Sequence, residues 1–119
     1  MRSARGAFVQ VLVAVPSARL AARLSRSLLQ QRLCACAQTL GPVTSRYRWR
    51  GRLEQAREWL LLLKTRRVLL AAVEREIRRQ HPYEVPEILA LPVQSGSAPY
   101  LEWLQRECAR PYGVTGSRS

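Results

Sequence analysis

The stretch SRYRWRGRLE, residues 45–54, decides the fold because it places a tight turn between two long strand-like segments. A residue followed by glycine suits a two-residue hairpin loop, and here that pair is Arg50-Gly51. At about 3.3 Å per residue, the flanking segments 35–49 and 52–65 are too long to end within a domain of this size. Gly41-Pro42 predicts a bend or bulge along the first strand, because proline cannot donate to an interior ladder. The sequence therefore predicts a hairpin whose tip projects beyond the core.

A turn at Arg50-Gly51 also fixes which side chains of the hairpin lie opposite one another. Trp49 is expected to pair with Arg52, and Tyr47 with Glu54. Arg46 and Arg48 then point to the other face. A cation-π contact between Arg52 and Trp49 is expected from this pairing. The tip then carries aromatic side chains on one face and arginines on the other.

The remaining segments complete an alternating pattern of strands and helices. They are a strand at 8–15, a helix at 18–32 capped by Ser17, a helix capped by Thr65 and ended by Pro82, a strand at 87–91, and a helix from Ser97. The order βαββαβ, followed by an additional C-terminal helix, predicts an α+β fold: a ferredoxin-like sandwich with both internal helices on one sheet face. We expect one domain at residues 7–110, a disordered basic lead at 1–6 and a disordered tail at 111–119.

The second face of such a sheet needs a cover. A projecting hairpin with exposed aromatic residues and free strand edges would leave apolar surface in contact with water in a single copy. Self-association buries that surface, so a homo-oligomer is expected.

Composition narrows the class of protein further. The net charge of +12 attracts polyanions nonspecifically, and the sequence predicts no nucleic-acid partner beyond that attraction. No segment approaches the roughly 18 apolar residues that a membrane span requires. An odd number of cysteines, three, speaks against a disulfide framework and favours a reducing, cytoplasmic location.

Two groups of residues are candidates for metal binding. His81 is the only histidine, and its imidazole suits copper or zinc, with Glu84 or Glu87 adding a carboxylate across the proline turn. The alternative is that His81 hydrogen-bonds the last carbonyls of its helix. Cys34 and Cys36 share a strand face and suit either a soft metal or the packed core.

The sequence contains no clear set of catalytic residues. Cys36 and His81 would make a nucleophile and a base, yet nothing in the sequence places them within reach of one another. A small ferredoxin-like acylphosphatase needs an asparagine, and the chain contains none. The protein is therefore predicted not to be an enzyme.

Five segments resemble the divalent cation tolerance proteins of the CutA family. They are VLVAVPS (residues 11–17), SRYRWRGRLE (45–54), LLLLKTR (60–66), HPYEVPEILALP (81–92) and YLEWL (100–104). The resemblance implies a homotrimer of ferredoxin-like protomers, similar in architecture to PII signalling proteins, and a role in tolerance to copper and other divalent cations. It implies weak copper binding by His81, Glu87 and Cys36, although Val13 stands where some bacterial members carry a cysteine proposed as a ligand. It also implies a pocket between subunits, lined by Tyr47, Trp49, Lys64, Tyr83, Tyr100 and Trp103.

Two functions remain open on the sequence. The first is a homotrimeric divalent cation tolerance protein that binds copper or another divalent ion weakly. The second is a trimeric PII-like signalling or scaffold protein that binds a small anionic ligand or anchors a partner protein, with Lys64 and the arginines of the hairpin tip as contacts.

Overall fold

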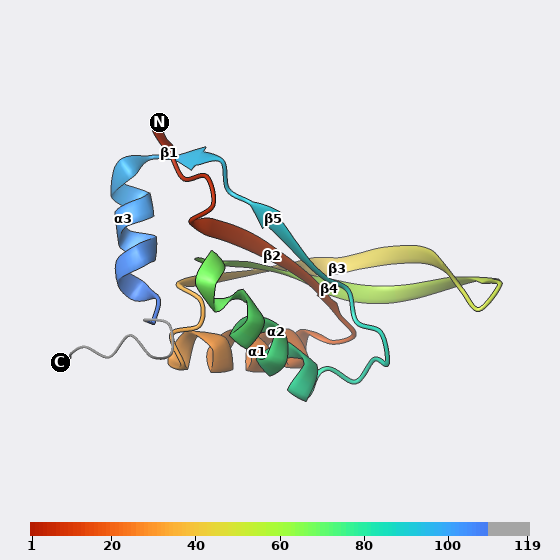
Figure 1. The fold of residues 1–119 in the computed structure, drawn as a ribbon. Helices are drawn as coiled ribbons and strands as arrows, with labels where there is room; N and C mark the ends of the chain where they lie inside the picture. Colours follow the sequence, from red (N-terminus) through yellow and green to blue (C-terminus); the bar gives the residue numbers. More distant parts are fainter. Residues whose placement is uncertain (110–119) are drawn as a thin grey trace.

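The apolar runs of the sequence form the strands of one large sheet and the helix faces that cover it (Figure 1). The computed structural model describes residues 1–109, which form a mixed α+β fold with three α-helices and two antiparallel sheets. The elements are β1 (Arg2–Ser3), β2 (Phe8–Val15), α1 (Ala18–Gln30), β3 (Cys36–Trp49), β4 (Arg52–Arg66), the 3₁₀ turn η1 (Arg67–Leu69), α2 (Leu70–Gln80), β5 (Ile88–Pro92), β6 (Ser95–Gly96) and α3 (Ala98–Glu107). No helix among these residues has the length and apolar character needed to cross a membrane.

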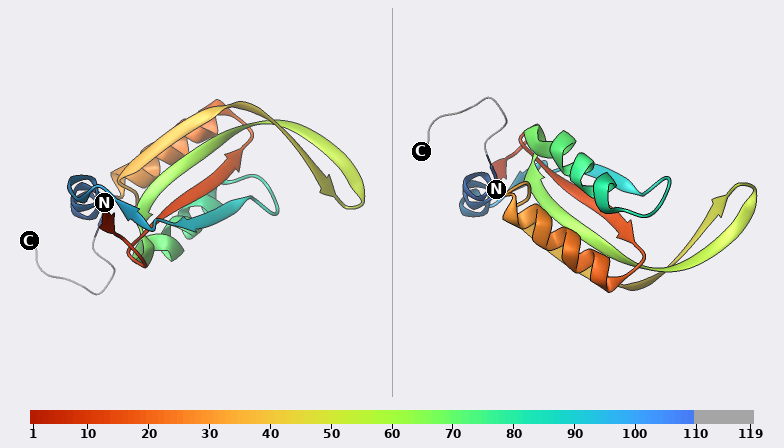
Figure 2. Two further views of the ribbon diagram at one scale, coloured as in Figure 1. Left: turned by 90° about the horizontal axis from the view of Figure 1, so that it is seen from above. Right: turned by 90° about the horizontal axis from the view of Figure 1, so that it is seen from below.

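The larger sheet is antiparallel with the strand order β3-β4-β2-β5, and α1 and α2 lie side by side on one of its faces (Figure 2). Alternate residues of β2, including Val11 and Val13, are fully buried against these helices. Leucines spaced four apart in α1 meet them, as the sequence predicted, and the Ser17 side chain accepts a hydrogen bond from the Leu20 N–H at the helix start. This layer is the main hydrophobic core.

The hairpin has the predicted turn and register. Arg50 and Gly51 both have positive φ, 53° and 79°, which is the backbone that a tight two-residue turn between twisted strands requires. Trp49 pairs with Arg52 and Tyr47 with Glu54, and the ladder shifts between Leu40 and Val43, where a bulge was expected. The long β3-β4 hairpin gives the molecule a long axis of 50 Å, compared with 30 and 23 Å in the other two directions. Its tip lies beyond the helices (Figure 2).

Two local predictions were wrong. The basic lead is ordered: Arg2–Ser3 form β1 by pairing with β6, and Ala4 packs in a small second core with Phe8 and Leu101 of α3. Thr65 does not cap a helix, because β4 continues through it and its hydroxyl donates to the Leu33 carbonyl at 2.5 Å. The predicted tail at 111–119 lies outside the described residues.

The face of the large sheet opposite α1 and α2 carries apolar side chains that are open to solvent. Leu40, Leu89 and Leu91 are 54%, 56% and 43% exposed. Leu12 and Leu62 lie beside them in the cross-strand row that contains Leu89, and both are half-buried. In a single copy of the chain this apolar sheet face is therefore uncovered, as the sequence led us to expect.

Candidate functional site

The single histidine is held by two hydrogen bonds at the end of α2. Its Nδ1 accepts the Tyr83 N–H at 3.2 Å, so the ring proton is on Nε2, which donates to the Ala14 carbonyl of β2 at 2.7 Å. His81 is buried, and its ring lies 4.7 Å from that of Tyr83. Both nitrogens are thus engaged within the chain, and neither has a lone pair free for a metal in this conformation.

Tyr83 connects the loop after α2 to the hairpin. Its hydroxyl donates to the Glu58 carboxylate of β4 at 2.9 Å, and Glu58 is buried. Burial, together with the neighbouring Glu58 carboxylate, raises the pKa of Tyr83 to about 12, so the phenol keeps its proton at neutral pH. His81, Tyr83 and Glu58 therefore form a continuous chain of contacts from the core to the hairpin.

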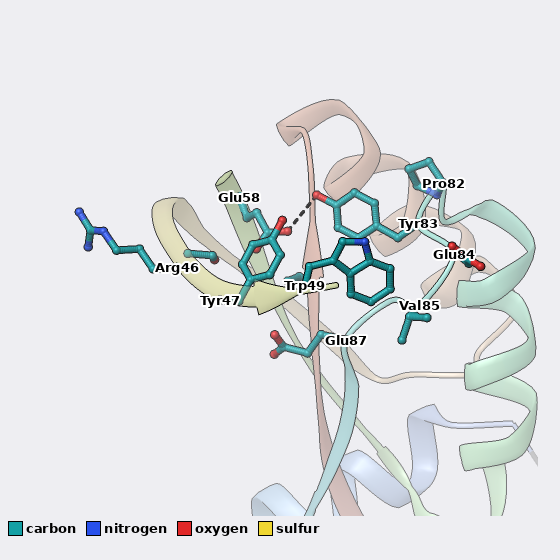
Figure 3. Close-up of a pocket in the computed structure, with 11 residues that line it drawn as sticks. Arg46, Tyr47, Trp49, Glu58, Pro82, Tyr83, Glu84, Val85 and Glu87 are labelled. Atoms are coloured by element: carbon teal, nitrogen blue, oxygen red, sulfur yellow. Dashed lines mark hydrogen bonds between the residues drawn. The ribbon is translucent and has the colours of Figure 1, made fainter. Parts of the chain in front are cut away.

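Between this loop and the hairpin lies a cavity of about 650 Å³. Figure 3 shows aromatic rings from both segments around it. Its lining residues are Ala14, Ser45, Arg46, Tyr47, Trp49, Glu58, Pro82, Tyr83, Glu84, Val85 and Glu87. Three of the eight carboxylates of a chain with net charge +12 line this one cavity. The pocket is acidic and aromatic on a protein that is otherwise strongly basic.

The rim of the pocket contains a cation supplied by the protein itself. The Arg50 guanidinium lies 5.2 Å from the centre of the Trp49 ring and 3.0 Å from a Glu84 oxygen. The sequence predicted that Arg52 would make the cation-π contact. Arg50 makes it instead, and the same guanidinium forms an exposed ion pair with Glu84.

The other predicted pocket residues lie at the opposite end of the sheet. Lys64 is paired with Cys36 on β3 and with Gln10 on β2, and its ammonium donates to the Gln38 side chain. Tyr100 and Trp103 of α3 stack at 5.5 Å, and burial together with the nearby Cys36 raises the pKa of Tyr100. Gln10 lies beside Lys64, and Ala14 lines the cavity. These two residues are four positions apart along β2, or about 13 Å.

The six predicted pocket residues therefore separate into two groups within one chain. Tyr47, Trp49 and Tyr83 line the cavity beside the hairpin, whereas Lys64, Tyr100 and Trp103 form a second group near Cys36. Only contact between copies of the chain would bring the two groups into one pocket.

The proposed copper ligands also lie apart within one chain. Glu87 lines the cavity, His81 is behind it with both nitrogens engaged, and Cys36 is in the group with Lys64. Across residues 1–109, no three His, Cys, Asp or Glu side chains come together in a way that would hold a metal ion. The residues of a single chain do not fit a copper centre as they are arranged, and the predicted ligand set stays a prediction.

Sequence reasoning missed Glu58, the buried acid of the pocket. The available signal was its position immediately before the apolar run WLLLL, where a carboxylate inside a core strand requires a partner. Its partner, Tyr83, is 25 residues away, and no local pattern connects the two.

A family model, sequence relatives and a solved structure all point to one protein family. Residues 9–107 match the family described as CutA1 divalent ion tolerance protein. Protein CutA of Mus musculus is 37% identical over 101 residues, which are 85% of this chain and 57% of the mouse protein. Divalent-cation tolerance protein CutA of Thermus thermophilus is 40% identical over 95 residues, 80% of this chain and 92% of that protein. The crystal structure of CutA1 from Oryza sativa superposes with a TM-score of 0.84 at 36% identity, covering 90% of this chain and 98% of its own. The chain spans little more than half the length of its mouse relative.

Proposed function

The chain belongs to the CutA1 divalent ion tolerance protein family, and we propose that it contributes to divalent-cation tolerance by binding copper or another divalent ion weakly, without catalysing a reaction. One observation carries this proposal. Glu58, Glu84 and Glu87 line a single cavity of a chain whose net charge is +12. Carboxylate oxygens attract divalent cations, so this acidic pocket is where such a protein offers a cation a favourable field.

The working form is proposed to be a homotrimer of ferredoxin-like protomers. The element order from β2 to β5 and the strand order β3-β4-β2-β5 agree with a ferredoxin-like sandwich. The exposed leucines on the helix-free face, Leu40, Leu89 and Leu91, supply apolar surface that neighbouring copies would cover. Three free cysteines agree with the proposed cytoplasmic, reducing location.

His81, Glu87 and Cys36 remain the proposed copper ligands, and they would have to come from more than one copy. Glu87 is the exposed member of the set and lines the cavity. Ligation by His81 would require the ring to release the Tyr83 N–H or the Ala14 carbonyl. This cost agrees with weak binding.

The test is a calorimetric titration of Cu²⁺ into the full chain without a histidine tag, at neutral pH. We expect saturable binding that Glu87→Gln weakens by about tenfold or more, with the loss of a charged ligand. Glu74→Gln removes an exposed carboxylate of α2 that does not line the cavity, and should leave binding unchanged. Binding that is indifferent to both Glu87→Gln and His81→Ala would refute the proposed ligands. Because imidazole ligates only when neutral, binding should also weaken in acid.

A PII-like signalling or scaffold role is the second candidate. It is favoured by the group at the other end of the sheet, where the only lysine of the chain, Lys64, lies in the row of Cys36 near α3. A lysine beside aromatic side chains suits a small anionic ligand. A thermal-shift screen with nucleotides and carboxylate metabolites tests this role, since a ligand that binds the native state raises the Tm. No Tm increase in the wild type, or one kept by Lys64→Met, would count against this second role.

A further inference from the structure

We propose that the outer face of helices α1 and α2 docks an acidic segment of a partner protein. This outer helix face is defined by the arginines of the two helices, which are Arg19, Arg23, Arg26, Arg75, Arg78 and Arg79. The helices cover one face of the large sheet, and the apolar face that neighbouring copies are proposed to cover is the opposite one (Figure 2). The proposed homotrimer therefore leaves the outer helix face open to solvent.

The arginines of α1 form one outward row. Arg19, Arg23 and Arg26 are spaced i, i+4 and i+7, so they share one side of the helix, and all three are exposed. The buried leucines of α1 lie on the opposite side, against the sheet. No aspartate or glutamate occurs in α1, and none precedes Glu54 in the sequence. The row therefore has no acid in its own helix to neutralise it.

Helix α2 lies antiparallel beside α1 and widens the basic surface. Ser27 donates to Glu76 at 2.6 Å, and Arg23 donates to Gln80 at 3.1 Å, so the two helices run in opposite directions through these contacts. Arg23 uses its Nε in this bond, and its terminal nitrogens form no hydrogen bond within residues 1–109. A guanidinium held in this way presents a planar set of donors that matches a carboxylate.

The acids of α2 do not neutralise this surface. Glu74 pairs with Arg78 at 3.1 Å and Glu76 pairs with Arg79 at 2.7 Å, so both glutamates are already engaged. Arg75 is exposed and forms no salt bridge within residues 1–109. With six arginines against two glutamates, the outer helix face keeps an excess of positive charge. Such a surface is complementary to an acidic partner.

Three features favour an acidic protein segment over other polyanions. Neither helix contains an aromatic residue, so the face lacks the rings on which single-stranded nucleic acids stack. Copies related by rotation would direct their helix faces differently, so a flat membrane or a rigid duplex would meet only part of the charge, whereas flexible segments can reach every copy. Leu29, three residues after Arg26 on α1, is 39% exposed and offers an apolar contact that a phosphate backbone cannot use.

The experiment measures binding of a short fluorescein-labelled peptide of glutamates with one central leucine to the full chain, by fluorescence anisotropy. The same peptide with glutamines in place of the glutamates is the uncharged control. We expect saturable binding that is at least about tenfold tighter for the charged peptide. Binding should weaken between about 0.01 and 0.1 M salt, because the screening length falls from about 30 to about 10 Å. Equal affinity for the two peptides, or no saturable binding, would overturn the proposal.

Charge-reversal variants locate the binding. The double variant Arg23→Glu, Arg26→Glu should weaken peptide binding at least about tenfold, and Arg75→Glu several-fold. The matched control, Arg5→Glu with Arg106→Glu, changes the net charge as much as the double variant does, at exposed positions outside the outer helix face. Light scattering and circular dichroism check that assembly and fold are kept. If either helix variant leaves the affinity unchanged, or the control weakens it as much as the double variant does, the proposal fails.

Other partner classes are tested with the same variants, using phosphatidylserine vesicles and a duplex DNA oligonucleotide. Leu29→Ala should weaken peptide binding several-fold and leave DNA binding unchanged. A loss in the double variant that is as large for vesicles or DNA as for the peptide, or wild-type peptide affinity in Leu29→Ala, would overturn the assignment to a protein partner. None of these residues lines the cavity, so Cu²⁺ binding should persist in every variant, and the divalent-cation proposal can fail independently.

Discussion

Replacing Glu76 by glutamine should destabilise the fold in a manner that depends on pH. Glu76 lies in α2 and is buried, yet it is ionised because three side chains donate to it. The Ser27 hydroxyl of α1 and the Gln80 amide each donate at 2.6 Å, and Arg79 donates at 2.7 Å. The Ser27 hydrogen bond joins the two helices that cover the sheet, and the other two lie within α2.

The size of the effect follows from the carboxyl group's pKa. Hydrogen bonding from Arg79 is the main cause that lowers the pKa of Glu76 from 4.5 to about 2. At about 1.4 kcal/mol per unit, such a shift has an upper limit of about 3 kcal/mol. The Arg79 side chain is 67% exposed, so solvent screening reduces the attraction, and about 1–2 kcal/mol is expected.

The sign of the pH dependence is fixed because the pKa of Glu76 is lowered on folding. Its stabilisation is fully present above the unfolded pKa of 4.5 and is lost as the pH falls from there toward about 2. Urea unfolding of wild type and Glu76→Gln, followed by circular dichroism, should therefore differ most near neutral pH and converge in acid.

Glu74→Gln is the matched control for this experiment. Glu74 is 47% exposed and forms an i,i+4 pair with Arg78, so its loss should cost no more than about 0.5 kcal/mol at any pH. Equal effects of the two substitutions, or a Glu76→Gln difference that persists unchanged into acid, would refute the assignment of the charge network.

Three further predictions concern the sheet face, the pocket and the bulge. Leu89→Asp places a charge on the open apolar face and should lower the molar mass measured by light scattering, whereas an unchanged mass would argue against an interface there. Tyr83→Phe removes the donor to buried Glu58 and should lower the free energy of unfolding by about 1–3 kcal/mol in urea titrations; no change would mean that water replaces the hydroxyl. Gly41→Ala should destabilise by about 1–3 kcal/mol, because its Cβ would lie 2.5 Å from a Trp59 ring atom, and a neutral result would show that the indole moves aside.

Local chemistry was sufficient to predict much of the fold. The pair Arg50-Gly51 determines the hairpin turn. The position of this turn then determines the cross-strand pairs of Trp49 and Tyr47. The spacing of leucines and the Ser17 cap determine α1. Each of these predictions depended on residues within a few positions of one another.

The misplaced elements depended on distant partners. Thr65 stays in β4 because it pairs with Val9, and its hydroxyl finds the Leu33 carbonyl instead of a helix N-terminus. The lead becomes a strand because β6, more than 90 residues later, offers free backbone groups to Arg2 and Ser3. Secondary-structure propensity, which depends on neighbouring residues, cannot reveal the partner of Thr65 or of the N-terminal lead. Glu58 was missed for the same reason, since it meets Tyr83 only after the hairpin and the loop after α2 are both in place.

The same geometry changes how a His81 substitution must be interpreted. His81 positions Tyr83 through its Nδ1, and Tyr83 in turn satisfies Glu58, so His81→Ala would disturb the pocket even if no metal ever touched the ring. Loss of Cu²⁺ binding in that variant alone cannot separate a ligand from a support. His81→Gln retains an amide donor for the Ala14 carbonyl and an oxygen acceptor, while replacing the imidazole by a much poorer copper ligand. If Cu²⁺ binding is lost in both variants, His81 is a ligand; if His81→Gln restores binding, the histidine is a support for the pocket and the carboxylates alone attract the cation.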